Sequence, residues 1–183
     1  MILETGRLIL RPFKLEDAAD LYEYLKEPLV NCFSCMKINS IEEAKESILK
    51  RMNEELDFAI VLKETGKVIG EINAHPESVS PDDSIKDTYS PCWMLNKDYH
   101  GNGYAYEAVY SFFDYLFNSF NARRIYAYTE DYNIPCQKLC EKLGMRKEGV
   151  FKEFVAFVND NNGNPIYENT LQYAILKKEW VLK

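Results

Sequence analysis

The segment from Trp93 to Ala105 constrains the fold most, because an apolar strand runs directly into two spaced glycines and then into a helix. Glycine has no Cβ, so Gly101 and Gly103 can adopt positive φ and let a ligand approach the backbone closely. The first N–H groups of the helix have no intrahelical partner, and they lie at the positive end of the helix dipole. These features predict an anion cradle that suits a phosphate or a pyrophosphate.

The segment departs from two common phosphate motifs. A dinucleotide fingerprint needs a third glycine where Tyr106 stands, and a P-loop needs Lys-Ser or Lys-Thr where the chain has Tyr104 and Ala105. A plain glycine-containing turn before a core helix is therefore the alternative to an anion cradle.

The composition indicates a globular protein, with 46% hydrophobic residues among 183, and we expect a single domain over residues 1–183. A net charge of −7 opposes a broad nucleic-acid-binding face and suits a cationic substrate such as an amine. No apolar run approaches the roughly 18 residues of a membrane span, and Met1 to Glu4 lacks the form of a signal peptide. We therefore expect a cytoplasmic protein without a membrane partner.

The five cysteines are an odd number, which predicts reduced thiols in a chain without an export signal. Cys32 and Cys35 have the spacing of half a zinc knuckle, but no second close pair exists, so no metal site is expected. Cys136 and Cys140 lie four residues apart on an expected helix and share one face. Buried cysteines are usually inert, so neither is presumed reactive.

Hydrophobic periodicity and turn residues divide the chain into seven strands and four helices. Ser40 to Glu43 has a capping-box pattern, Lys63 to Lys67 reads as a hairpin turn, and Gly144 suits the C′ position of a helix. The polar stretch from Pro76 to Asp87 predicts a surface loop. The expected strands are Arg7 to Phe13, Phe58 to Leu62, Val68 to Ala74, Tyr89 to Leu95, Arg124 to Thr129, Arg146 to Val158 and Ile166 to Leu176; the expected helices are Leu15 to Leu25, Ile41 to about Glu55, Tyr104 to Phe117 and about Asn133 to Leu143.

The order of these elements predicts an α+β fold with a mixed, mostly antiparallel sheet. Meander connections dominate the first half of the chain, and only its middle has βαβ form. A doubly wound dinucleotide fold would alternate strands and helices throughout, so this order opposes it.

This order and four local signatures resemble the GNAT superfamily of acyl-CoA-dependent N-acetyltransferases over nearly the whole chain. The opening Thr5 to Pro12, and Trp93 before His100 to Ala108, look like the branch that includes ribosomal-protein N-terminal alanine acetyltransferases. The other two signatures are Asn133 to Met145 and Tyr173 to Trp180, of which the last resembles the closing strand of that branch.

The resemblance implies a sheet splayed at its centre, with acetyl-CoA as co-substrate in the opening. It places the pyrophosphate on the amides of six consecutive residues, and the pantetheine arm along the backbone of Met94 and Leu95. Asn133 and Cys136 would face the pantetheine and its thiol end. The six implied cradle residues are His100, Gly101, Asn102, Gly103, Tyr104 and Ala105.

Acetyl transfer needs a neutral amine, whereas a free lysine amine has a pKa of about 10.4, so a base or a water path must take its proton. Glu71 is the base candidate because it lies on the strand adjacent to the expected cofactor strand, although a solvent-facing carboxylate is the alternative. The resemblance implies that the backbone N–H of Leu95 stabilises the oxyanion. Glu107 is expected to make a structural hydrogen bond, and His100 to lie too far from the acetyl group to act as base.

Three residues depart from the pattern of the family. Cys140 stands where many members place a tyrosine acid, so that role is vacant or falls to a thiol. Cys136 stands where relatives usually have serine, and an acyl-cysteine intermediate has no basic partner to support it. Asn169 stands where relatives often carry aspartate, which leaves the binding of the acceptor amine open.

Our principal hypothesis is an acetyl-CoA-dependent N-acetyltransferase that acts by direct transfer in a ternary complex. The acceptor would be a primary amine: a protein N-terminus, a polyamine or a small amine. The alternative is a non-catalytic acyl-CoA-binding module, motivated by Cys140 and Asn169; a nucleotide-binding oxidoreductase is a more remote reading. The edges of a splayed sheet are compatible with a homodimer.

Overall fold

The computed structural model describes residues 1–78 and 84–180, which form two compact units. The first unit comprises Met1–Leu29, Met36–His75 and Pro91–Tyr115, and the second comprises Val30–Cys35, Pro76–Ser90 and Leu116–Lys183. Part of the expected loop from Pro76 to Asp87 lies outside the described residues. The loop was predicted to begin at Pro76, but Pro76 and Glu77 are the last residues of β4 (Val68–Glu77).

In the described parts of the chain, eight strands follow the order β1-β2-β3-β4-β5-β6-β8-β7 in the sheet, which confirms the mixed α+β class. β5 (Thr88–Leu95) and β6 (Arg124–Glu130) pair in parallel, and the pairs β1–β2, β2–β3, β3–β4, β6–β8 and β7–β8 are antiparallel. The β5–β6 pairing comprises the two register pairs Thr88–Arg124 and Tyr89–Ile125, at the beginning of both strands. Such a short pairing agrees with the expected splay at the centre of the sheet.

The first unit contains β1 (Leu3–Glu4), β2 (Leu8–Arg11), β3 (Asp57–Leu62) and most of β4. β3 and β4 form the expected hairpin, and Gly66 has φ 72° in its turn. The short strand β1 was not predicted, because its only signal is pairing with β2 through Leu3–Leu10 and Glu4–Ile9.

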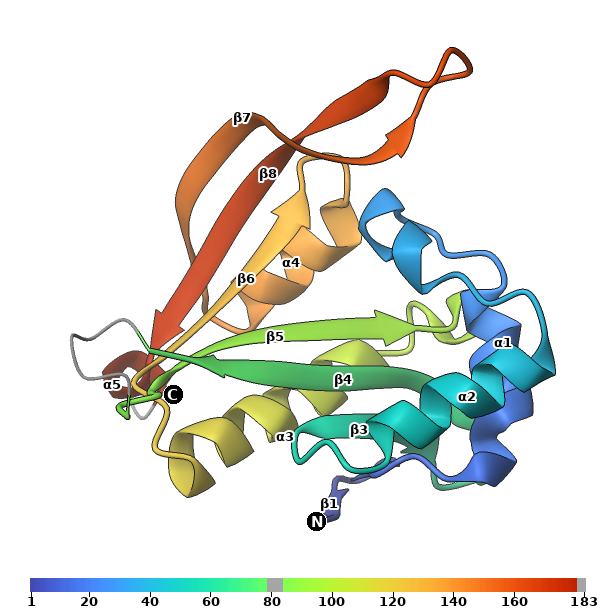
Figure 1. Ribbon diagram of the computed structural model, residues 1–183. Helices are drawn as coiled ribbons and strands as arrows, with labels where there is room; N and C mark the ends of the chain where they lie inside the picture. The colour runs from blue at the N-terminus through green and yellow to red at the C-terminus, as the bar shows by residue number, and fades with distance from the viewer. Residues whose placement is uncertain (79–83, 181–183) are drawn as a thin grey trace. The chain divides into compact units, whose positions relative to one another are not determined.

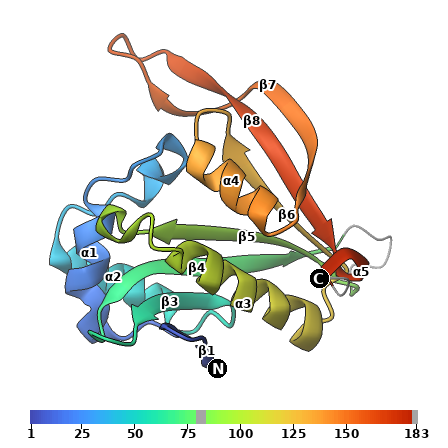
Figure 2. The same cartoon turned by 180° about the vertical axis from the view of Figure 1, so that it is seen from behind.

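Helices cover both faces of these strands (Figure 1; Figure 2). The rings of Phe58 and Trp93 contact Phe112 and Phe113 of α3 (Tyr104–Ser119) on one face. On the other face, Tyr24 of α1 (Ala18–Leu25) and Arg51 of α2 (Ile41–Arg51) bond to Glu71. Trp93 therefore packs against α3.

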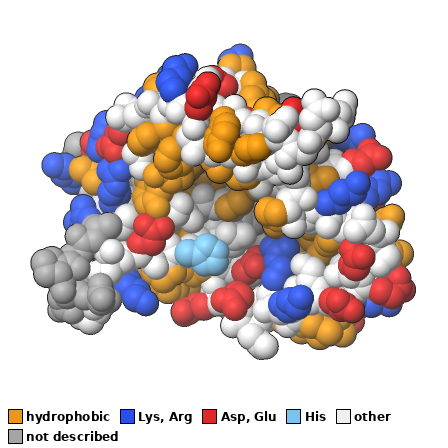
Figure 3. All heavy atoms as spheres, turned by 45° about the horizontal axis from the view of Figure 1, so that its top comes forward, with side chains coloured by type: hydrophobic (Ala, Val, Ile, Leu, Met, Phe, Trp, Pro, Cys, Tyr) orange, Lys and Arg blue, Asp and Glu red, His pale blue; other side chains and the backbone are white. Residues whose placement is uncertain are grey.

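The second unit is built on β6, β8 (Pro165–Leu176) and β7 (Arg146–Asn159), with α4 (Ile134–Lys142) beside β6 (Figure 1). β7 and β8 form a long hairpin, and β7 bulges between Phe151 and Val155, where Glu153 has φ 47°. Exposed apolar side chains follow this hairpin along the top of Figure 3. They belong to Val150, Phe154, Phe157, Ile166 and Tyr167.

Several boundaries differ from the predictions. α2 ends at Arg51 rather than near Glu55, because the chain turns there, with Glu54 N bonding Arg51 O, and enters β3 at Asp57. Ser40 caps α2 by accepting a bond from Glu43 N, but the Glu43 carboxylate accepts from Asn39 N instead of completing the capping box. Gly144 has φ 75° just after α4, as expected for C′.

The remaining elements are short. The 3₁₀ turns among the described residues are η1 (Leu15–Asp17), η2 (Asn31–Met36) and η3 (Lys97–Tyr99), and α5 (Lys177–Trp180) follows the last strand. Within the described ranges, no helix has the length and apolar character that crossing a membrane requires.

Candidate functional site

The two glycines before α3 have the backbone conformations that the sequence predicts. Gly101 has φ 77° and Gly103 has φ 80°, a region that other residues adopt only with strain. The first backbone bond of α3 runs from Glu107 N to Gly103 O, so the amides of Tyr104 and Ala105 precede the hydrogen-bonded turns. A Cβ added at Gly101 would meet nothing within 4 Å, so the space beside the loop is open. This geometry fits a phosphate group.

The chain between β5 and the glycines is held by side chains of its own segment. Asn96 is 3% exposed; its Oδ1 accepts from Asp98 N, and its Nδ2 donates to Glu23 at 2.8 Å. The ring Nε2 of His100 lies 3.0 Å from the Leu95 carbonyl oxygen. Because a carbonyl oxygen can only accept a hydrogen bond, the bond requires the tautomer in which Nε2 carries the proton. His100 therefore fastens the loop to the end of β5.

The glycine loop is also tied to the N-terminal segment through Glu107. The Glu107 carboxylate accepts from Thr5 Oγ1 at 2.6 Å and from the backbone N and Nε of Arg7, each at 2.7 Å. Arg7 Nη1 donates to the Asn102 carbonyl at 2.9 Å, and the guanidinium lies 4.5 Å from the centre of the Tyr104 ring. The structural role expected for Glu107 is confirmed, and its partners connect the loop to the first strands.

Gly70 marks a close approach of two strands that the sequence reading missed. A Cβ at this position would lie 2.3 Å from the Met94 carbonyl oxygen and 3.0 Å from Leu95 Cα. Real Cβ atoms do not approach backbone atoms so closely, so only glycine lets β4 lie this near the end of β5. The backbone around Met94 and Leu95, expected to meet the pantetheine arm, owes its position to this glycine.

Glu71 lies in a buried ion network rather than facing solvent. Glu71 is 2% exposed, and its Oε2 accepts hydrogen bonds from Tyr24 Oη at 2.8 Å and from Arg51 Nη1 at 3.1 Å. Arg51 also forms a bidentate pair with Asp57 at 2.6 and 2.7 Å. Burial and the neighbouring Glu71 carboxylate raise the pKa of Tyr24, so the phenol keeps its proton and donates it to Glu71. Both hydrogen bonds to Glu71 go to Oε2.

The second unit carries the other three predicted residues, which belong to one helix and its cap. Asn133 caps α4 by accepting from Cys136 N at 3.3 Å. A hydrogen bond from the Cys140 thiol lowers the pKa of Cys136, and the same bond, with burial, raises the pKa of Cys140. Cys140 is fully buried. A buried thiol of raised pKa is a weak proton donor, which argues against the acid role suggested for Cys140.

Asn169 has a structural position in this unit. Its Nδ2 donates to Asp131 Oδ2 at 2.7 Å, and its Oδ1 accepts from the backbone N of Glu153 at 3.0 Å. Asn169 thus holds the bulge of β7.

Two buried carboxylates in the same unit were not found from the sequence. Glu130 ends β6 and is 3% exposed, and Glu168 of β8 is 9% exposed. Glu168 accepts from Asn31 Nδ2 and from Tyr132 Oη, whereas Oε1 of Glu130 has no hydrogen-bond partner among the described residues. Nothing in the local sequence distinguishes these glutamates from exposed ones, since their burial depends on strand pairing.

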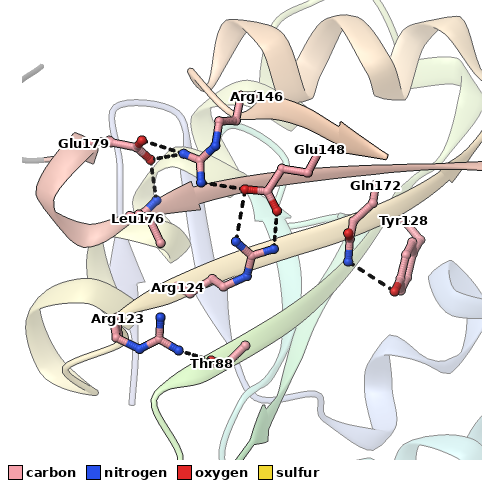
Figure 4. Close-up of polar contacts among 9 residues, drawn as sticks. All are labelled: Thr88, Arg123, Arg124, Tyr128, Arg146, Glu148, Gln172, Leu176 and Glu179. Atoms are coloured by element: carbon pink, nitrogen blue, oxygen red, sulfur yellow. Dashed lines mark hydrogen bonds and ion pairs between the residues drawn. The ribbon is translucent and has the colours of Figure 1, made fainter. Parts of the chain in front are cut away.

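A separate ion cluster fastens the beginning of β6 to the neighbouring strands (Figure 4). Glu148 of β7 accepts from Arg124 and from Arg146, and Arg146 also pairs with Glu179, whose carboxylate accepts from Leu176 N. Hydrogen bonds from Arg124 lower the pKa of Glu148 despite partial burial. Each charged side chain of this cluster has an oppositely charged partner within it, so we assign the cluster a structural role.

In the part of the chain that the structure describes, no group of three or more His, Cys, Asp or Glu side chains could hold a metal ion. Cys32 and Cys35 lie in η2 as thiols rather than as a disulfide.

Comparison with known proteins identifies the family. The family model described as "Acetyltransferase (GNAT) domain" matches residues 7–146. The uncharacterized N-acetyltransferase YnaD of Bacillus subtilis (strain 168) is 30% identical over 181 residues, which cover 98% of this chain and 99% of the relative. An uncharacterized N-acetyltransferase of Bacillus licheniformis is 32% identical, with 97% of each chain covered.

Solved structures show the same fold. The crystal structure of a GNAT-family acetyltransferase from Bacillus anthracis is similar with a TM-score of 0.84 and 28% identity, covering 98% of this chain and 100% of that chain. A ribosomal-protein-S5-alanine acetyltransferase from Vibrio fischeri has a TM-score of 0.74 at 22% identity, with 98% of each chain covered. The chain therefore belongs to the GNAT family of N-acetyltransferases.

Proposed function

We propose that this enzyme transfers the acetyl group of acetyl-CoA to a primary amine by direct transfer in a ternary complex. The observation that carries the proposal is the glycine loop, in which Gly101 and Gly103 have positive φ directly before the N-terminus of α3. Backbone amides and the helix dipole at such a turn favour a bound pyrophosphate.

We assign the binding of acetyl-CoA to three segments of the chain. The amides from His100 to Ala105 would bind the pyrophosphate, and the backbone of Met94 and Leu95 would meet the pantetheine arm. Asn133 and Cys136, at the N-terminus of α4, would face the pantetheine and its thiol end. When bound, acetyl-CoA supplies the activated acetyl group.

Glu71 is the proposed acceptor of the proton that leaves the amine. Both of its hydrogen bonds use Oε2, so Oε1 can accept from an amine or from an intervening water. Arg51 and Tyr24 fix the carboxylate in one orientation. The backbone N–H of Leu95 is the proposed oxyanion donor, and Cys140 has no proposed step because its buried thiol donates a proton poorly.

Titration calorimetry with acetyl-CoA tests the cradle. We expect micromolar binding by the unmodified enzyme and a loss of at least about tenfold in Gly101→Asp and Gly103→Asp, because an added carboxylate repels phosphate and forces a strained φ. Gly66→Asp is the matched control, since Gly66 also has positive φ and open space but lies in the β3–β4 turn. Equal binding by all four proteins would refute the cradle.

The acceptor class is the open part of the function. Similar folds include the alanine acetyltransferase from Vibrio fischeri and a chimera of spermidine N-acetyltransferase from Vibrio cholerae, at 22% and 20% identity. A panel of protein N-terminal peptides, polyamines and monoamines therefore follows the binding experiment. Binding of acetyl-CoA without turnover on any amine would favour a non-catalytic acyl-CoA-binding module.

A further inference from the structure

The buried carboxylates of the described residues fall into two groups, those with and those without a cationic side chain as partner. Asp17 pairs with Arg11, and Asp57 and Glu71 pair with Arg51. Glu130 and Glu168 are comparably buried, yet no ion pair with a lysine or arginine is found for either among the described residues. A buried carboxylate without a cation is costly, so an unbalanced pair points to a cation that the chain does not supply.

Strand pairing brings these two glutamates to the same face of the sheet. Glu130 of β6 lies opposite Thr170 of β8, and Glu168 is two residues from Thr170 along the same strand. Because side chains alternate along a strand, Glu130 and Glu168 are diagonal neighbours on one face. Both carboxylates raise the pKa of Tyr132, after burial as the largest cause, so both act on the same phenol.

The polar groups around the pair leave room for one more donor. Glu168 is held by Asn31 Nδ2 on one oxygen and by Tyr132 Oη at 3.1 Å on the other. Oε1 of Glu130 is buried and has no partner in the described ranges. A buried polar atom without a partner is rare and calls for a missing donor. An ammonium group supplies both the missing hydrogen bond and the missing charge.

Aromatic rings continue from this cluster on the same face. Phe151 of β7 lies opposite Thr170. Tyr128 lies opposite Gln172 and precedes Glu130 by two residues along β6. The centroids of Phe151 and Tyr128 are 6.2 Å apart, and Phe154 lies 5.1 Å from Phe151. Tyr128 and Phe154 are about half exposed, so they offer an open apolar surface for methylene groups beside the carboxylates.

We infer that Glu130 and Glu168 form an ammonium subsite that binds the second, non-reacting amine of a dicationic aliphatic acceptor. This inference rests on the proposed function and narrows its acceptor class to small diamines and their longer relatives. A divalent metal ion is a poor alternative, because the described residues offer no group of three ligands.

Two matched amines test the subsite: butane-1,4-diamine and butylamine, which differ by one ammonium. Steady-state rates at saturating acetyl-CoA are measured for the unmodified enzyme, Glu130→Gln and Glu168→Gln. Glu148→Gln is the control, because Glu148 is a carboxylate of the same unit whose charges are satisfied by Arg124 and Arg146. Calorimetric binding of the diamine, in the absence of acetyl transfer, is measured in parallel, and circular dichroism confirms folding.

We expect KM for the diamine to rise at least about tenfold in Glu130→Gln and Glu168→Gln, because a desolvated charge-assisted bond is lost. KM for butylamine should change by less than about twofold, and Glu148→Gln should resemble the unmodified enzyme for both amines. Equal effects on both amines, or none on either, would overturn the subsite while leaving acetyl transfer standing. Diamine binding that Glu130→Gln abolishes, without turnover of any amine, would support the subsite and overturn the proposed function instead.

Discussion

Arg51 pairs with two carboxylates, Asp57 and Glu71, and point mutations can distinguish their roles. Asp57 accepts hydrogen bonds from Nε and Nη2 of Arg51. Glu71 accepts from Nη1 of Arg51 and from the phenol of Tyr24. A Glu71→Gln variant removes the proposed proton acceptor but retains its shape. Asp57→Asn weakens the same ion network without touching Glu71.

We expect Glu71→Gln to lower kcat/KM by about 10²-fold or more, the contribution usual for a positioned base. Asp57→Asn should lower it by less than about tenfold, since its effect on the chemistry is indirect. Acetyl-CoA affinity should be unchanged in both. Rates measured as a function of pH, with thermal unfolding as the check on folding, decide the matter: if the two variants lose activity equally, Glu71 is a structural partner of Arg51 and not the base.

At the scale of single residues, sequence reasoning succeeded where the signal was local. Gly101 and Gly103 were recognised from a strand, a turn and a helix within thirteen positions. Glu71 was selected for its strand, but its burial and its pairing with Arg51 depend on contacts 20 residues apart in sequence. Glu130 and Glu168 were missed because their shared face arises from the register between β6 and β8.

At the scale of elements, the link between the N-terminal segment and α3 holds the glycine loop that we propose to bind acetyl-CoA. Glu107 takes bonds from Thr5 and Arg7, while Arg7 also reaches the Asn102 carbonyl in the glycine loop. Although partial burial opposes ionisation, these bonds from Thr5 and Arg7 lower the pKa of Glu107, so the carboxylate is charged at neutral pH.

Glu107→Gln should weaken acetyl-CoA binding by about three- to tenfold, because a loosened loop must be ordered when the ligand binds. Glu4→Gln is the control: Glu4 forms an exposed pair with Lys63 in the same N-terminal segment and does not touch the loop. Titration calorimetry gives both values. Unchanged affinity in Glu107→Gln would show that the loop keeps its conformation without this tether.

Element prediction worked for the helices and strands with clear periodicity and turn residues, such as the β3–β4 hairpin and α3. The errors lie where tertiary contacts decide. β1 has only two residues and exists through pairing with β2, and η2, in which no residue is fully buried, has no periodic signal. α5 follows β8 where the resemblance suggested only a closing strand.

At the scale of the whole molecule, the direction of the pKa shifts predicts how stability depends on pH. Among the residues that the structure describes, five carboxyl groups have lowered pKa values, chiefly through hydrogen bonds from lysine, arginine, threonine, asparagine or backbone groups: Glu23, Glu107, Glu148, Asp160 and Glu179. The native state binds fewer protons at these groups than the unfolded chain does near their ordinary pKa. Their stabilisation is therefore present above about pH 4.5 and is lost as the pH falls through the lowered values.

Three tyrosines with raised pKa values set the alkaline limit. Burial, with neighbouring carboxylates, raises the pKa of Tyr126, Tyr132 and Tyr173 to about 12. The unfolded chain would lose these protons near pH 10, whereas the native state retains them, so their stabilisation is present below pH 10 and is lost as the pH rises toward 12. Urea unfolding across the pH range should give a plateau of free energy from about pH 5 to pH 9.5 that falls on both sides. A maximum at the isoelectric point near pH 5.0 would instead show that net charge dominates.

The missing Cβ of Gly70 has a consequence for reading other sequences. Any side chain at this position would push the Met94 carbonyl away, and the strand edge that it belongs to would move with it. A homologue with a larger residue at the equivalent position must therefore solve the approach of these two strands differently. The residue at this position in an aligned sequence thus becomes a criterion for sorting relatives by how closely β4 approaches the end of β5, without any structure of them in hand.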